Sequence, residues 1–213
     1  MNYYQEVSLL PDADISLSFI WENVFQQVHI ALVENKGDDN NSHVAVSFPQ
    51  YGHREFPFGR QLRLFAKQED QLQQLDLPQW LNRLSDYTHI KTIQPTPKDV
   101  TYVSFQRENV KSPKRIEKAM QKKAALWAKK SGRPLADCLA DLEKTKPTGS
   151  CDLPFVYLYS QQTKQHAPDN NPRFPLFIKM TVENNAQTGE FDCYGLSAKR
   201  NHRDNKGTVP QFA

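Results

Sequence analysis

The residues best suited to acid–base chemistry or metal binding in this sequence are its histidines and cysteines, and both sets are scattered. The six histidines, at 29, 43, 53, 89, 166 and 202, form no HxxxH or HExxH pattern. No two of the three cysteines form a CxxC pair; they are Cys138, Cys151 and Cys193. These spacings match neither a zinc site nor a disulfide framework. We therefore expect no metal, no cofactor, and buried thiols in a reducing compartment.

The densest charged segment, residues 111–133, has nine Lys and Arg residues and one acid, Glu117. Ser112-Pro113 suits the start of a helix and Ser131-Gly132 its end. On a helical projection most basic residues fall on one side. The opposite side carries Ile116, Met120, Ala124 and Trp127. The segment predicts a helix that packs by one face and presents positive charge on the other.

This basic face has several possible interpretations. The simplest is a solvated surface, but such a surface normally mixes signs because like charges at i,i+4 destabilise a helix. A membrane surface or calmodulin is disfavoured because the apolar side has only three large residues. An acidic protein partner, with the chain as an interaction scaffold, stays open. A polyanion, and nucleic acid in particular, fits the charge density best.

The charge of the whole chain is divided in the same sense. Residues 1–97 contain 7 Lys and Arg against 12 Asp and Glu, whereas residues 98–213 contain 20 against 12. The polyanion is therefore expected at the C-terminal half. The sequence has no apolar run of the roughly 20 residues that span a bilayer, and its N-terminus lacks the features of a signal peptide. A cytoplasmic location is the expectation.

The elements of the N-terminal half are expected in the order β-α-β-β-α-β, which is the ferredoxin-like pattern. They cover 3–10, 16–34, 44–51, 60–66, 69–85 and 89–94. The Pro-rich stretch at 95–98 marks a boundary between domains at 1–97 and 98–213. After it we expect a strand at 102–107, the basic helix, and strands at 154–160, 174–182 and 190–197. Two polar stretches, 166–173 and 198–207, are expected to be loops.

Several short strings, in order and nearly end to end, resemble the type I-F CRISPR repeat-processing endoribonucleases. These enzymes cut the CRISPR precursor transcript into guide RNAs. The strings are VHIALV (28–33), VAVSFP (44–49), GRQLRLFA (59–66), SPKRIEKAMQKK (112–123), LPFVYLYSQQTKQH (153–166), FPLFI (174–178), CYGLS (193–197) and GTVPQF (207–212). The order and spacing of the strings, with a basic helix at the expected place, make the resemblance specific.

The resemblance implies an α+β protein with an N-terminal ferredoxin-like (RRM-like) domain and a C-terminal α+β domain carrying the RNA-binding helix. That helix lies in the major groove of the repeat stem-loop. The residues implied to bind RNA are Ser104, Gln106, Lys111, Lys114, Arg115, Lys118, Lys122, Lys123, Gln162 and Phe174. Phe174 would stack on the terminal base pair. Lysines replace many of the family's arginines here, so we expect more reliance on phosphate contacts than on base reading.

The resemblance also implies the catalytic residues, which are His29, Ser160 and Tyr194. By its own pattern His29 would be a packed core histidine, since it shares a helical face with Phe25 and Leu32. The family makes it the residue that acts on the attacking 2′-hydroxyl. Ser160 would orient the ribose and Tyr194 would lie beside His29. Gln162 stands where a second ribose-contacting serine is usual.

The expected function is that of a metal-independent endoribonuclease. It would bind the CRISPR repeat stem-loop of precursor crRNA and cut at the 3′ base of the stem, leaving 2′,3′-cyclic phosphate and 5′-hydroxyl ends. The family implies that it then stays on the hairpin as a subunit of the crRNA-guided surveillance complex. The alternative is a subunit that binds the hairpin without cleaving it.

Overall fold

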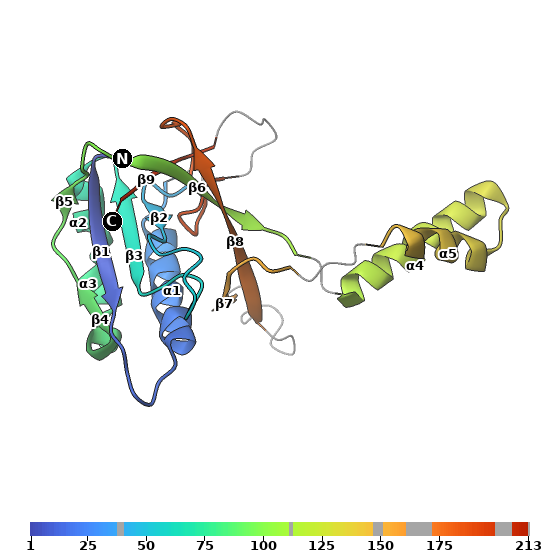
Figure 1. Cartoon of the computed structure of the whole chain (residues 1–213), viewed down its shortest axis with the longest axis horizontal. Coiled ribbons are helices and arrows are strands. Elements are labelled where there is room, and N and C mark those ends of the chain that lie inside the picture. The colour runs from blue at the N-terminus through green and yellow to red at the C-terminus, as the bar shows by residue number, and fades with distance from the viewer. Residues whose placement is uncertain (38–40, 111–112, 147–150, 161–171, 199–205, 213) are drawn as a thin grey trace. The chain divides into compact units, whose positions relative to one another are not determined.

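The computed structural model describes residues 1–37, 41–110, 113–146, 151–160, 172–198 and 206–212 (Figure 1). These residues form two compact units. Unit 1 comprises Met1–Glu108 and Leu153–Ala213, and unit 2 comprises Asn109–Asp152. Within the described residues, no helix is long and apolar enough to cross a membrane.

The first sheet of unit 1 is antiparallel, with the strand order β2-β3-β1-β4. A short strand, β5, also pairs with β1. This is the ferredoxin-like order, so the predicted fold of this half is confirmed. The elements in chain order are β1 (Tyr3–Leu9), α1 (Leu17–Glu34), β2 (Ala45–Ser47), β3 (Gln61–Ala66), α2 (Glu69–Leu75), α3 (Leu77–Trp80), η1 (Asn82–Tyr87), β4 (Thr88–Ile90) and β5 (Gln94–Pro95).

Helix α1 forms because apolar residues recur at helical spacing and Ser16 caps its N-terminus. The Ser16 hydroxyl accepts a hydrogen bond from the Phe19 backbone N–H. The buried side of α1 carries Trp21, Phe25 and Val28, all fully inaccessible. They pack into a core that also takes in β1, β3 and the second sheet. The helix that positions His29 is thus held by large buried side chains.

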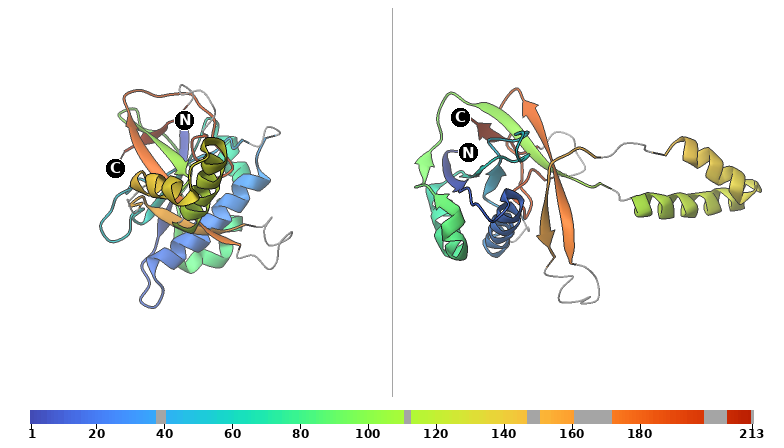
Figure 2. Two further views of the ribbon diagram at one scale, coloured as in Figure 1. Left: turned by 90° about the vertical axis from the view of Figure 1, so that its right-hand side faces the viewer. Right: turned by 60° about the horizontal axis from the view of Figure 1, so that its bottom comes forward.

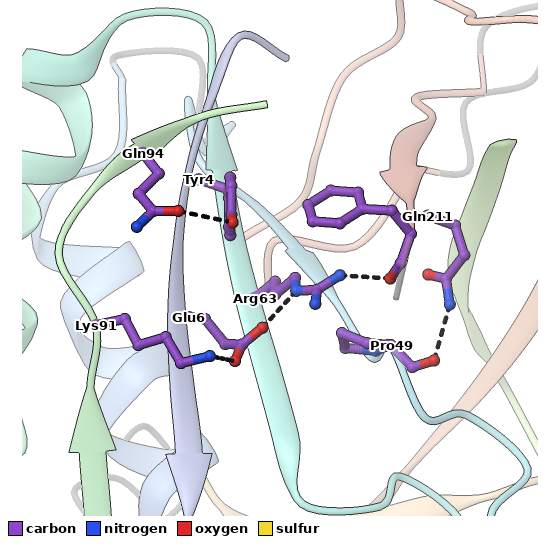
Figure 3. Close-up of polar contacts among 8 residues, drawn as sticks. Tyr4, Glu6, Pro49, Arg63, Lys91, Gln94 and Gln211 are labelled. Atoms are coloured by element: carbon purple, nitrogen blue, oxygen red, sulfur yellow. Dashed lines mark hydrogen bonds and ion pairs between the residues drawn. The ribbon is translucent and has the colours of Figure 1, made fainter. Parts of the chain in front are cut away.

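The opposite face of the first sheet carries a buried ion network, drawn in Figure 3. Arg63 Nε donates to Glu6 Oε2 at 2.7 Å, and Lys91 Nζ lies 2.7 Å from Glu6 Oε1. Arg63 also donates to the carbonyl of Phe212 at 2.7 Å. The Phe212 ring lies edge-on to Tyr4 at 5.1 Å. This network fastens the C-terminal segment onto the ferredoxin-like sheet.

The second sheet of unit 1 has the strand order β7-β8-β6-β9, all antiparallel. Its strands are β6 (Thr101–Glu108), β7 (Phe155–Tyr159), β8 (Arg173–Glu183) and β9 (Val209–Gln211). Polar contacts fasten it to α1. The Tyr159 backbone N–H donates to Gln26 Oε1 at 2.7 Å, and Arg173 forms a two-bond ion pair with Glu22. The sheet that carries Ser160 is thereby tied to the helix that carries His29.

Unit 2 is a helical hairpin of α4 (Pro113–Ser131) and α5 (Leu135–Lys144), which run side by side in Figures 1 and 2. Gly132 ends α4 with a left-handed φ of 70°. The buried residues are Ala124, Cys138 and Leu142, with Met120, Ala128 and Leu139 packed against them. The segment expected to be a basic helix forms α4, with Met120 and Ala124 on its packed side. Trp127, expected on that side, is 38% exposed.

The structure differs from the sequence expectations at four elements. The helix expected at 69–85 is broken into α2, α3 and η1, because Asp76 adopts a left-handed φ of 46° before Pro78. The strand expected at 190–197 is a tight turn with isolated bridges. Strand β9 was not expected, nor was α5 as a separate helix. The boundary predicted at residue 97 falls between the two sheets, and both sheets belong to unit 1. The division into domains at 1–97 and 98–213 stays a prediction.

Candidate functional site

His29 lies near the C-terminal end of α1, where its side chain is held by one hydrogen bond and one ring contact. Its Nδ1 lies 2.9 Å from the backbone carbonyl oxygen of Cys193. Because a carbonyl can only accept, Nδ1 must carry a proton, and in the neutral ring Nε2 then holds the lone pair. The Tyr194 ring stacks on the imidazole with centroids 4.3 Å apart and planes 17° apart. The geometry prepares Nε2 of His29 to accept a proton.

The turn that presents Cys193 and Tyr194 is closed by its own aspartate. Asp192 Oδ1 accepts the backbone N–H groups of Tyr194 at 2.9 Å and Leu196 at 3.0 Å. Gly195 has a φ of 70°, and a Cβ there would lie 2.6 Å from Val46 Cγ2. Only glycine suits both the left-handed backbone and this close approach. The hydrogen bonds of Asp192 and the conformation of Gly195 therefore hold the Cys193 carbonyl and the Tyr194 ring in place against His29.

A pocket of about 340 Å³ opens beside this contact, entirely within unit 1. It brings together the three residues expected from the sequence to act in catalysis and the one expected to stack on a base pair. Its lining residues are His29, Ile30, Val33, Glu34, Lys36, Tyr159, Ser160, Phe174, Cys193 and Tyr194. The Ser160 backbone N–H donates to the Pro172 carbonyl at 2.9 Å, which holds the end of β7 against the start of β8. The four residues lie on four different segments.

Burial and one nearby charge set the electrostatics of the pocket. Burial lowers the pKa of His29, the Cys193 carbonyl raises it, and the charge of Arg107 lowers it further, with a net result below 6.5. His29 is therefore neutral at physiological pH, as a proton acceptor must be. Burial also raises the pKa of Tyr194 above 10.0 despite the opposing effect of Arg107, so its hydroxyl keeps its proton.

The residues expected to read base pairs have different exposures. Ser104, on β6, is fully buried and its hydroxyl has no hydrogen-bond partner. It is out of reach of an RNA in this conformation. Gln106, two residues further along β6, is half-exposed and pairs in register with Lys179 of β8. Phe174 is half-exposed at the pocket. Of the two residues on β6, only Gln106 is accessible to a ligand.

Unit 2 separates its charges between its two helices. The acids of α5 are used locally, since Asp141 pairs with Arg133 at 2.8 Å and with Lys144 at 3.1 Å, and Glu143 pairs with Lys146 at 2.9 Å. In contrast, six exposed lysines of α4 form no ion pair with any described residue. They are Lys114, Lys118, Lys122, Lys123, Lys129 and Lys130. Arg115 is also exposed on this helix.

Two of the expected RNA-binding residues, Lys111 and Gln162, lie outside the described residues, as do most of the two polar stretches expected to be loops. Across the described part of the chain, no three His, Cys, Asp or Glu side chains are grouped so that they could hold a metal ion.

Two groups at or beside the pocket were not expected from the sequence, the Cys193 carbonyl and Arg107. The Cys193 carbonyl is a backbone group, so residue type carries no signal for it. Arg107 follows Gln106, but its alternation with Phe105 along β6 places it on the opposite face from Gln106. The available signal for Arg107 was the alternation of side chains along a strand. It places Arg107 on the same face as the buried residue Phe105.

Comparison with known proteins gives a consistent result. The family model described as "CRISPR-associated protein (Cas_Csy4)" matches residues 4–212. The chain is 30% identical over 199 residues to "CRISPR-associated endonuclease Cas6/Csy4" of Pseudomonas aeruginosa (strain UCBPP-PA14), covering 92% of this chain and 96% of the relative. It is 29% identical over 215 residues to the protein of the same name from Escherichia coli (strain UTI89 / UPEC), covering all of both.

A more distant likeness adds nothing to this. The solved structure titled "An RAMP protein binding different RNA substrates" is 9% identical over 99% of each chain, with a TM-score of 0.36. The match of the family model to nearly the whole chain, together with the two relatives, is sufficient. The chain belongs to the Cas6/Csy4 family of CRISPR-associated endonucleases, which process the repeats of type I-F systems.

Proposed function

We propose that this chain is a metal-independent endoribonuclease that binds the CRISPR repeat stem-loop in precursor crRNA and cleaves at the 3′ base of the stem. The names of its relatives support CRISPR endonuclease activity. The observation that carries the chemistry is the hydrogen bond from His29 Nδ1 to the Cys193 carbonyl at 2.9 Å. It fixes the tautomer in which Nε2 can act as a base, in a pocket that also holds Ser160 and Phe174.

The proposed reaction is an attack of the 2′-hydroxyl on the adjacent phosphorus. Ser160 orients the ribose, and His29 Nε2 removes the 2′-proton as the 2′-oxygen bonds to phosphorus. The bond from phosphorus to the 5′-oxygen breaks, and that oxygen takes up a proton. The products are a 2′,3′-cyclic phosphate and a 5′-hydroxyl. Proton transfer of this kind typically contributes about 10²–10⁴-fold to the rate.

The proposed RNA-binding surface is the lysine face of α4, with Gln106 and Phe174 in unit 1. Its support is the absence of ion pairs on six exposed lysines within the described residues, beside an α5 whose acids Asp141 and Glu143 are paired. Such a surface binds phosphates by releasing counterions. The phenyl ring of Phe174 offers a stacking surface at the pocket. Retention on the cut hairpin, as a subunit of the surveillance complex, is part of the same proposal.

The test is single-turnover cleavage of the cognate repeat hairpin in excess EDTA, with wild type and His29→Ala. We expect wild type to cleave and His29→Ala to lose at least about 10²-fold in rate, while hairpin binding is retained. His89→Ala, which changes an exposed histidine on β4, is the matched control and keeps full activity. Mass spectrometry of the 5′ fragment should give the mass of a cyclic phosphate.

Four outcomes would contradict the proposal, each at a different point. Loss of wild-type cleavage in EDTA would mean that a metal is required, and full activity of His29→Ala would remove the base. Hairpin binding without cleavage by wild type would favour the non-cleaving subunit. Equal binding of a scrambled hairpin of the same length would argue against stem-loop recognition, and so against the RNA assignment in favour of a general polyanion.

A further inference from the structure

Arg107 places a permanent positive charge beside the pocket. On β6 it lies on the same side as Val103 and Phe105, since alternate residues of a strand share a face. Its guanidinium carbon is 5.4 Å from the centroid of the Tyr194 ring and 5.8 Å from that of Phe174. These two rings line the pocket that contains His29 and Ser160. Arg107 therefore contacts both Phe174, which is proposed to stack on the RNA, and Tyr194, which contacts the proposed base His29.

Arg107 differs from two other arginines of unit 1, Arg63 and Arg173, because no described carboxylate forms an ion pair with it. Arg63 pairs with Glu6, and Arg173 pairs with Glu22. The acid that Arg107 influences, Asp192, uses Oδ1 to accept two backbone N–H groups of its own turn. The two rings and a hydrogen bond with the Tyr194 hydroxyl replace part of the hydration that this half-buried guanidinium loses, but its charge gains no described carboxylate. An anion brought by a ligand would therefore stabilise it.

The anion that fits is a phosphate of the bound RNA. The planar guanidinium of arginine matches two phosphate oxygens at once, and it stays charged at every relevant pH. The rings of Phe174 and Tyr194 both contact this group, which restricts its position before a ligand arrives. A fixed donor costs no reorganisation when charge develops during a reaction. Arg107 is thus suited to bind charge that grows at the reacting phosphorus.

We propose that Arg107 is a further catalytic residue, which contacts a non-bridging oxygen of the scissile phosphate and stabilises the five-coordinate phosphorus. This inference rests on the proposed function. As the 2′-oxygen bonds to phosphorus and its proton moves to His29, the phosphoryl oxygens gain negative charge. The charge disperses when the 5′-oxygen leaves and takes up a proton. Arg107 exchanges no proton and forms no covalent bond in either step.

The charge of Arg107 has a second consequence, through His29. It lowers the pKa of His29, in addition to the larger effect of burial. Removing it should therefore raise that pKa. Loss of packing would also raise it by hydrating the imidazole, so Arg107→Lys, which keeps the charge, separates the two causes. The other titratable or charged groups around His29 stay in place in such a variant. They are Glu34 at the end of α1, Lys36 shortly after it, Tyr159 on β7, and Asp192, Cys193 and Tyr194 in the turn.

The test compares Arg107→Gln, Arg107→Lys and wild type with saturating protein and cognate hairpin. We expect Arg107→Gln to lose about 10²–10³-fold in single-turnover rate, as when one preorganised donor to a developing charge is removed. Its affinity for a hairpin with a 2′-deoxy nucleotide at the cut should fall only about threefold, since one phosphate contact is lost among several. Arg107→Lys keeps the charge without the planar fork and should have an intermediate rate.

The pKa of His29, measured by NMR titration of the free protein, supplies the second readout. It should rise in Arg107→Gln and stay near the wild-type value in Arg107→Lys. Lys179→Gln, which removes an exposed cation from the neighbouring strand β8, is the control and should change neither the rate nor this pKa.

The inference is overturned if Arg107→Gln cleaves within threefold of wild type, or if its defect lies wholly in affinity. His29→Ala, assayed in parallel, separates this failure from failure of the proposed function. If His29→Ala is inactive while Arg107→Gln is active, only the role of Arg107 is wrong. If His29→Ala cleaves fully, the proposed mechanism itself is wrong, whatever Arg107→Gln does.

Discussion

The two compact units differ most in how they are stabilised. Unit 1 has large aromatic side chains in its core, among them Trp21, Phe48 and Phe58, which are all inaccessible. Among the described residues of unit 2, the core contains only Ala124, Cys138 and Leu142 as buried residues. A segment this small buries little apolar area and is marginally stable by itself. Unit 1 can hold side chains rigidly for chemistry, whereas unit 2 is suited to ordering its surface on a partner.

The units also treat charge in opposite ways. Unit 1 neutralises buried charges internally, as in the contacts of Glu6 with Arg63 and Lys91. Unit 2 leaves its α4 lysines without ion pairs to any described residue, whereas Asp141 and Glu143 of α5 are paired with nearby cations. Under the proposed function, most of the RNA affinity comes from unit 2 and the cleavage chemistry from unit 1. Each prediction below tests whether the two can be changed separately.

The largest expected effect is on stability. Phe48 contacts the rings of Trp21, Phe25, Phe58 and Phe105, so Phe48→Ala should lower the free energy of unfolding of unit 1 by about 3–5 kcal/mol. Leu142→Ala should loosen only the α4–α5 hairpin. Denaturant unfolding followed at Trp21 and at Trp127, with the other tryptophans replaced, would resolve the two units. One transition that both substitutions shift equally would contradict the comparison.

The next effect is on RNA affinity. Lys118→Gln with Lys122→Gln removes two unpaired charges from α4, whereas Lys144→Gln with Lys146→Gln removes two that are paired with acids. The α4 pair should reduce the slope of log affinity against log salt by about 1.5–2, and the control pair by much less. Single-turnover cleavage at saturating protein should be unchanged in both. Equal slopes for the two variants would mean that only net charge matters.

Much of the fold could be predicted because its elements have strong periodicity. The ferredoxin-like order, α1 and α4 all follow from apolar spacing and end signals such as Ser16 and Gly132. Residues 190–197 could not be read in this way. They alternate like a strand, but Asp192 and Gly195 form a turn whose geometry depends on contact with Val46, far away in the sequence. Strand β9 is too short to show a period.

The candidate site was predictable only through the family resemblance. By spacing alone His29 looked like a core histidine, and it is indeed half-buried on α1. What makes it a candidate base is its contact with the Cys193 carbonyl, 164 positions later in the chain, and with the ring of Tyr194. Arg107 matches no quoted string and became visible only through its two ring contacts. The candidate site depends on contacts between residues far apart in the sequence, and local sequence patterns do not predict such contacts.

The smallest expected effect is on pH dependence, and it separates cleavage from binding most cleanly. Folding lowers the pKa of His29 below 6.5, mainly by burial. At a salt concentration where the hairpin dissociates faster than it is cut, kcat/KM reports the free enzyme. It should be level at neutral pH and fall on acidification, with a midpoint below 6.5. Hairpin affinity should not follow this curve, since the proposed binding surface on α4 contains no histidine.

The lowered pKa of His29 also determines how the stability of the folded protein changes with pH. The unfolded chain takes up a proton on His29 before the folded protein does, so the contribution is present above about pH 6.5 and is lost as pH falls toward the lower folded value. In His29→Ala this part of the stability profile should flatten. A kcat/KM midpoint above 6.5 in wild type would contradict a desolvated base. Affinity and cleavage falling together along one curve would show that a shared titrating group links the two units.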